Sequence, residues 1–176
     1  KVITKEKFFR TTLNHCETLD DWTVSGSLSK SIDLTDRVRG AGSFKVEFDS
    51  GSNNETIDLA VDRKVVLLRK IYFYFRCSRV GMKIRFGFGE SSWTEKQWDI
   101  EADRTGWKLL EFETDSVSFS KIGAWRYEII NSEDDDFFHV EEIEIVEKTA
   151  LHLELQLREA KYEMKAEKVV SLTMGQ

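Results

Sequence analysis

Hydrophobic and polar residues alternate with a period of two along most of the chain. The clearest stretches are residues 44–48, 57–61, 71–77, 82–88, 109–113, 124–130 and 143–145. Because successive side chains of a strand point to opposite faces, each stretch predicts a strand with one apolar and one mainly polar face. Turns rich in Gly, Asn, Asp and Ser separate these strands at intervals of about 8–15 residues. The pattern predicts an all-β fold, an antiparallel two-sheet β-sandwich of jelly-roll type over residues 1–147.

Two irregularities in this pattern predict local backbone features. Val140 and Ile143 are out of phase, which predicts a bulge or bend at Glu141–Glu142. The run Gly87-Phe88-Gly89 places two glycines inside a strand, which indicates a bulge or close backbone packing.

The pattern changes after Glu147, where residues 149–170 contain no glycine and many helix formers. An apolar stripe at three- and four-residue steps predicts a C-terminal helical segment over residues 148–176, and its members are Ala150, Leu153, Leu157, Ala160 and Met164. A competing interpretation is a strand, because Leu151, Leu153, Leu155 and Leu157 alternate strictly. A helix with an apolar stripe needs a partner, so we expect it to pack on the sandwich or to support a homo-oligomer or larger assembly.

Composition narrows the class of protein. The chain has 176 residues, no proline, and 12 Phe, five Trp and four Tyr, which is too aromatic for a disordered chain. It has no run of about 18 apolar residues, so we expect no membrane span. A net charge of −6 disfavours nucleic acid as a partner. We expect no signal peptide, and Lys1 at the first position suggests that an upstream segment was removed or is not shown.

Catalytic motifs are missing from the sequence. The three histidines lie in unrelated contexts, and the sequence contains no GxSxG, HExxH, P-loop or GxGxxG motif. We therefore expect that the protein is not an enzyme. Cys16 and Cys77 permit one disulfide, but their spacing leaves the pairing open.

Acidic residues raise the question of a bound metal ion. The run 133–136 offers oxygen ligands, but without the spacing of an EF-hand it is more typical of a solvated turn. A structural Ca²⁺ held between distant loops is the other possibility, and its candidate ligands are Asp36, Asp49 and Glu142.

Aromatic and basic residues on the polar strand faces are the most informative feature for function. Tyr72, Tyr74 and Arg76 are expected on the outward face of one strand, with Arg85 on a neighbouring strand. Trp93 and Trp98 lie in the polar stretch 90–98, interpreted as a loop. The candidate ligand-binding residues are Tyr72, Tyr74, Arg76, Arg85, Trp93, Trp98 and Trp125, whereas Trp22 and Trp107 are expected to cap the core. Flat rings can stack on pyranose faces, although protein interfaces and cross-strand pairing use the same residue types.

The order of these pieces resembles the galactose-binding-like jelly rolls, which include many carbohydrate-binding modules. The resembling elements, which span about residues 8–147, are Leu19-Asp20-Asp21-Trp22 with Gly26, residues 39–46, 71–77 and 82–88, Thr105-Gly106-Trp107, and residues 140–145. In that family a structural calcium often lies between the first strand region, the loop before the Gly-Ser strand and an acid near the last strand. Here Glu142 stands where Asp is usual. The fold also occurs as a building block of phage and viral tail, spike and baseplate proteins.

These observations lead to one principal hypothesis and two alternatives. The principal hypothesis is a non-catalytic module that recognises a glycan or cell-surface component, within a larger extracellular or virion-surface assembly. The first alternative is a purely structural assembly subunit that uses the helix and a sheet face for subunit contacts. The weaker alternative is an accessory or catalytic domain of an enzyme.

Overall fold

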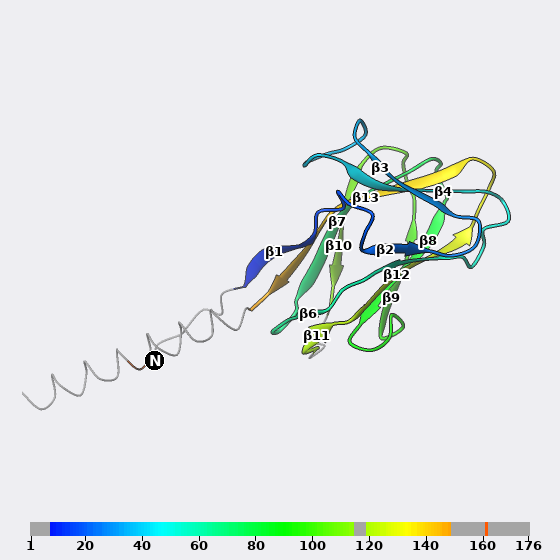
Figure 1. Ribbon diagram of the computed structural model, residues 1–176. Coiled ribbons are helices and arrows are strands. Elements are labelled where there is room, and N and C mark those ends of the chain that lie inside the picture. The colour runs from blue at the N-terminus through cyan, green and yellow to red at the C-terminus, as the bar shows by residue number, and fades with distance from the viewer. Residues whose placement is uncertain (1–7, 115–118, 149–160, 162–176) are drawn as a thin grey trace, which may run out of the picture.

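Two antiparallel β-sheets face each other in the computed structural model, which describes residues 8–114, 119–148 and 161 (Figure 1). Sheet A has the strand order β10 (Lys108–Glu113), β7 (Lys70–Cys77), β13 (Asp136–Glu147), β4 (Ser43–Phe48) and β3 (Ser29–Asp33), and β1 (Phe9–Asn14) also pairs with β13. Sheet B has the order β2 (Trp22–Val24), β5 (Thr56–Leu59), β12 (Ala124–Asn131), β8 (Lys83–Gly89) and β9 (Lys96–Glu101). A separate two-stranded ladder joins β6 (Arg63–Lys64) and β11 (Lys121–Ile122).

Period-two patterning explains why these residues form a sandwich. In β7 the buried side chains are Ile71, Phe73, Phe75 and Cys77, and the residues between them are only partly buried. The other long strands show the same alternation, so each sheet turns its apolar face toward the other sheet. The predicted antiparallel two-sheet sandwich is therefore confirmed.

The predicted fold class is wrong in its C-terminal helical segment. Within residues 8–114 and 119–148 every element is a strand, and β13 is the last of them. The prediction for residues 149–170 falls on positions that, apart from Lys161, lie outside the described residues. A helical sequence pattern expresses only a local preference, and most helices need an apolar surface to pack on. Here the two sheets bury each other's apolar faces, so the core needs no helix to cover it.

Aromatic rings fill the space between the two sheets. The ring of Phe86 from sheet B is fully buried. Its centroid lies between 4.7 and 5.3 Å from four other rings, those of Trp125, Phe112, Phe73 and Tyr127. Offset and edge-to-face contacts of this kind add to the free energy gained by removing large apolar surfaces from water.

The long strand β13 changes partner halfway along its length. Its first half pairs with β4 as far as Val140, and its second half pairs with β1 from Ile143 onward. The pairing with β7 shifts register between Glu141 and Glu144, and Glu142 has a φ of 48°. This confirms the bulge that the out-of-phase residues predict, and it leaves the side chain of Glu141 on the outer side of sheet A.

Two questions left by the sequence are answered for the described part of the chain. Cys16 and Cys77 are both free and buried, so they do not form a disulfide. Within residues 8–114 and 119–148 we find no helix with the length and apolar character needed to cross a membrane.

We predict that Phe86→Ala lowers the free energy of unfolding by about 3–5 kcal/mol, because the cavity left among the surrounding rings cannot collapse fully. Urea unfolding followed by tryptophan fluorescence measures this loss. Leu34→Ala serves as the control, since the Leu34 side chain is 65% exposed and its truncation should change the unfolding free energy by less than about 0.5 kcal/mol. Equal effects of the two substitutions would contradict the assignment of Phe86 to the core.

Candidate functional site

The outer side of sheet A carries a row of aromatic side chains, which we call the aromatic face. Its members are Tyr72, Tyr74, Trp107, Phe137 and His139. Tyr72 and Tyr74 come from β7, Phe137 and His139 come from β13, and Trp107 immediately precedes β10. Cross-strand register places Arg76 of β7 opposite His139. Three strands that are adjacent in the sheet thus bring these residues together.

Cationic side chains lie against three rings of the aromatic face. Arg10 Cζ is 4.3 Å from the ring centroid of Tyr72, and Arg39 Cζ is 5.3 Å from that of Tyr74. Lys45 Nζ lies 4.9 Å from the centroid of Phe137. Cation–π contacts of this kind orient the rings and place hydrogen-bond donors beside them.

An ion pair and an indole hydrogen bond hold one end of the aromatic face. Arg76 pairs with the carboxylate of Asp36, and its Nε donates to the carbonyl oxygen of Thr105 at 3.1 Å. Trp107 Nε1 donates to Asp36 Oδ1 at 2.8 Å. Trp107 was expected to cap the core, but its ring is only partly buried and belongs to this outer network. The sequence signal that could have placed Trp107 outside the core is the turn Thr105-Gly106 directly before it.

The segment 34–42, between β3 and β4, lies on the same side of sheet A. Glu141 is fully buried, and its carboxylate oxygens accept hydrogen bonds from the backbone N–H groups of Val38 and Arg39, each at 2.5 Å. Glu17 Oε1 accepts a third bond from the N–H of Ala41 at 2.6 Å. Burial raises the pKa of Glu141, while the two backbone donors act in the opposite direction. The segment is therefore fixed by carboxylates, and it carries Arg39 to the ring of Tyr74.

His139 is the buried member of the aromatic face, with 1% of its surface exposed. Its Nδ1 lies 2.9 Å from Ser43 Oγ. The rings of Trp107 and Phe137 meet it edge-on, with centroids 5.7 and 5.4 Å away. Burial lowers the pKa of His139 to about 4, so the ring is neutral at pH 7.

Asp33, Asp36 and His139 form the one group among the described residues that brings three possible metal-binding side chains together. One donor atom from each lies within 4.8 Å of the others. Asp33 Oδ1 already accepts hydrogen bonds from Thr35 N and Thr35 Oγ1, and Asp36 is engaged by Arg76 and Trp107. The guanidinium group of Arg76 supplies the positive charge that a metal cation would bring, so these three side chains do not fit a metal site.

The three predicted calcium ligands lie in three separate networks. Asp36 belongs to the aromatic face, Asp49 Oδ1 accepts from the N–H of Gly51 at 2.9 Å in a turn, and Glu142 Oε1 lies 2.9 Å from His15 Nδ1. The structure does not bring them together, because each carboxylate meets its own local donor. No cofactor is evidenced by these side chains.

Three other predicted ligand-binding residues are placed elsewhere. Arg85 lies on the outer side of sheet B, where its Nε donates to Asp99 at 2.8 Å, because the consecutive strands β7 and β8 belong to different sheets. Trp98 lies on β9 instead of a loop, and its ring stacks on Phe86 with centroids 5.7 Å apart. Trp125 is 2% exposed and is a core residue. Trp125 therefore offers no ring face to a ligand, and the partly buried Trp98 packs against the core.

Trp93 is the remaining candidate, and it lies away from the aromatic face. It is partly buried on the outer side of sheet B, where Arg126 Cζ is 5.4 Å from its ring centroid. The seven predicted residues therefore divide into Tyr72, Tyr74 and Arg76 on one outer face, Arg85 and Trp93 on the opposite one, and two tryptophans that pack in or against the core.

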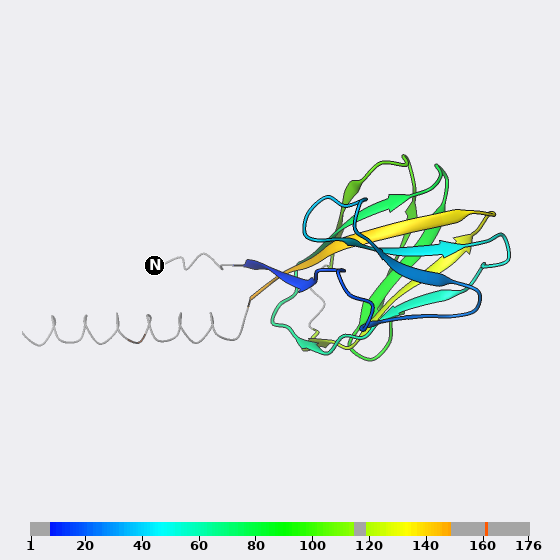
Figure 2. The same cartoon turned by 45° about the horizontal axis from the view of Figure 1, so that its top comes forward.

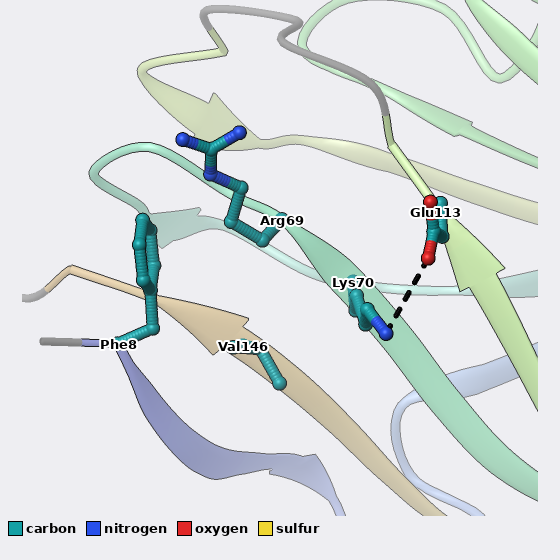
Figure 3. A pocket seen from close by; sticks show the side chains of 5 residues that line it. All are labelled: Phe8, Arg69, Lys70, Glu113 and Val146. Atoms are coloured by element: carbon teal, nitrogen blue, oxygen red, sulfur yellow. Dashed lines mark ion pairs between the residues drawn. The ribbon is translucent and has the colours of Figure 1, made fainter. Parts of the chain in front are cut away.

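A hollow of about 360 Å³ lies at the end of sheet A where β1 begins and β13 ends (Figure 3). Arg69 Cζ lies 4.9 Å and Lys148 Nζ 5.6 Å from the ring centroid of Phe8. Lys70 pairs with Glu113 across the hollow at 3.4 Å. The hollow contains a single aromatic ring, that of Phe8, so it offers a shorter stacking surface than the aromatic face.

Comparison with known proteins identifies the fold. No protein-family model matches the sequence, and no curated protein matches it. Among solved structures, the family 11 carbohydrate-binding module from Clostridium thermocellum, in complex with a β-1,3-1,4-mixed-linked tetrasaccharide, matches with a TM-score of 0.58 at 15% identity and covers 77% of this chain and 94% of its own. A family 30 carbohydrate-binding module matches with a TM-score of 0.59 at 11% identity, over 80% of this chain and 99% of its own.

A match to an enzyme is more limited in extent. The glycoside hydrolase domain of Endo-D from Streptococcus pneumoniae R6 matches with a TM-score of 0.56 at 19% identity, but over only 21% of that chain. The two carbohydrate-binding modules, in contrast, match over nearly their whole length. The predicted resemblance to the jelly rolls of such modules is therefore confirmed as a likeness of fold.

We predict that the free energy of unfolding decreases as the pH falls from about 6.5 toward 4, partly because of His139. The folded protein keeps this ring neutral down to a pKa of about 4, whereas the unfolded chain binds the proton near the ordinary value of 6.5. Between pH 6.5 and 4, His139 thereby lowers the free energy of unfolding by about 3 kcal/mol.

Urea unfolding at a series of pH values checks this prediction by comparing the wild type with His139→Asn. The variant should show a shallower decrease of unfolding free energy between pH 6.5 and 4, whatever its stability at pH 7. Parallel curves for the two proteins would show that His139 does not resist protonation in the folded state.

Proposed function

We propose that this chain is a non-catalytic module that binds glycan on its aromatic face. The observation that carries the proposal is the pair of half-buried rings of Tyr72 and Tyr74, aligned on one strand and each flanked by an arginine. Side chains two residues apart on a strand lie roughly 7 Å apart. The two rings therefore form a short row on which an extended oligosaccharide can lie.

The chemistry of this face suits a neutral sugar. The apolar C–H face of a pyranose can stack on a tyrosine ring, while its hydroxyl groups need donors and acceptors at the ring's edge. Arg10 and Arg39, which lie over the rings of Tyr72 and Tyr74, provide donors, and both pair with Glu144, which provides acceptors. The face therefore offers both donors and acceptors to the hydroxyl groups of a sugar.

The rigidity of the face supports the same proposal. Asp36 links Trp107 to Arg76, and Glu141 fixes the segment that carries Arg39. Side chains that are already ordered lose little conformational entropy when a ligand binds. The tetrasaccharide complex of a module with the same fold gives further support.

The wider context of the module stays a prediction. An extracellular or virion-surface location and assembly through residues 148–176 are untested expectations. Among the described residues, no observation favours a structural subunit over glycan binding.

We predict that Tyr74→Ala weakens binding of a β-1,3-1,4-linked glucan tetrasaccharide by about tenfold, because it removes one stacking ring and the group that Arg39 lies against. Tyr74→Phe should retain most of the affinity, since the ring remains. Isothermal titration calorimetry with this sugar, and with xylan and mannan oligosaccharides, measures the effect.

Gln97→Ala provides the control, because Gln97 is exposed on the opposite outer face and its loss should leave the affinity unchanged. If the wild type binds no oligosaccharide in the panel, or if Tyr74→Ala binds as well as the wild type, the aromatic face is not the glycan site.

A further inference from the structure

The segment 90–95, between β8 and β9, lies directly on the outer side of sheet B. Three glycines below it, two of them on β8, make this approach possible. A methyl group at Gly87 would overlap the carbonyl oxygen of Trp93 and lie 2.8 Å from its ring atom Cε3. Methyl groups at Gly89 and Gly123 would overlap the carbonyl oxygens of Ser92 and Glu90. Three positions without a side chain therefore seat this loop, and the close packing predicted for Gly87 and Gly89 is confirmed.

A carboxylate fixes the internal shape of the same loop. Glu95 Oε1 accepts hydrogen bonds from the N–H groups of Ser91 and Ser92, both at 2.8 Å, and Oε2 accepts from the N–H of Glu90 at 3.3 Å. These donors hold the pKa of Glu95 below its usual value. The loop is thus held by its close packing on the glycines and by the hydrogen bonds of Glu95, so the ring of Trp93 has a defined position.

A pocket of about 320 Å³ opens beside this ring. Besides the loop, its walls come from β5 and β12, where Arg126 makes a bidentate ion pair with Asp58 at 2.6 and 2.8 Å. Ser91 and Ser92, which carry hydroxyl groups, also line the pocket. A volume of this size is at the lower end of the range for small-ligand sites.

We propose that this pocket is a second glycan-binding site, which takes a single neutral sugar residue or the end of a chain. The indole offers an apolar stacking surface, and the paired Asp58 and Arg126 offer acceptors and donors for hydroxyl groups while cancelling each other's charge. An anion or a cation would have to break this pair, whereas a neutral hydroxylated ring does not. The choice of ligand class rests on the proposed function of the aromatic face.

The two sites lie on opposite outer sides of the sandwich, because β7 belongs to sheet A and β12 to sheet B. Each can be filled without obstructing the other. One module can therefore hold two glycan chains at once, and multivalent contacts of this type raise the apparent affinity for a polysaccharide surface.

The test uses the full chain, labelled with ¹⁵N, and follows the five tryptophan indole N–H signals in NMR titrations. The probes are glucose, galactose, mannose and xylose, together with the β-1,3-1,4-linked glucan tetrasaccharide. Trp93→Phe should retain part of the binding at the second site, and Trp93→Ala should weaken it by about tenfold or more. Gly87→Ala displaces the loop without removing the indole and should have the same effect as Trp93→Ala, provided that the spectrum shows a folded protein.

Tyr74→Ala separates the two proposals. Saturable shifts of the Trp93 indole in Tyr74→Ala, lost in Trp93→Ala, support the second site. If all sugar binding disappears in Tyr74→Ala and none is affected by Trp93→Ala, the second site is refuted while the aromatic face stands. Binding that depends on Trp93 alone supports the second site and refutes the first. If no probe perturbs the wild type, both proposals are refuted.

Discussion

The change of partner within β13 is the constraint on which the rest of the sandwich depends. One strand must complete sheet A beside β4, remain paired with β7, and then accept β1. The left-handed residue Glu142 makes this possible by breaking the register, and it leaves Glu141 to bond the backbone of the segment 34–42. The same irregularity that completes the sheet therefore also positions the loop beside Tyr74.

The two outer faces expose aromatic rings by different physical routes. On sheet A the rings follow from strand alternation, and their neighbours are charged side chains from adjacent strands and one loop. On sheet B glycines lie beneath the segment 90–95, so the backbone of the loop takes the place of side chains at these positions. The first arrangement gives an open row and the second a small pocket, which is why we assign them ligands of different length.

A sequence reveals features that depend on neighbouring residues more readily than it reveals which sheet each strand joins. Alternation was sufficient to predict β4, β5, β7, β8, β10, β12 and the end of β13, together with the bulge and the shared outward face of Tyr72, Tyr74 and Arg76, because these depend on neighbours along the chain. It did not predict β1, β3 or β9. The separation of Arg85 from Tyr72 and Tyr74 depends on which sheet β8 joins, and no local pattern encodes that choice. Trp98 was misplaced because polar neighbours masked its alternation with Ile100. Trp125 was misplaced because the burial of its ring depends on the opposite sheet, where it meets Phe73.

The pairing of β1 with β13 also decides how the module responds to tension. Phe9 lies opposite Glu147 and Thr11 opposite Ile145, so the two described ends leave the sandwich side by side (Figure 2). A pull applied through both ends separates these antiparallel strands one residue pair at a time, instead of loading all their hydrogen bonds together. We expect β1 to detach at low force, while β13 stays bound to β7 and the aromatic face keeps most of its structure.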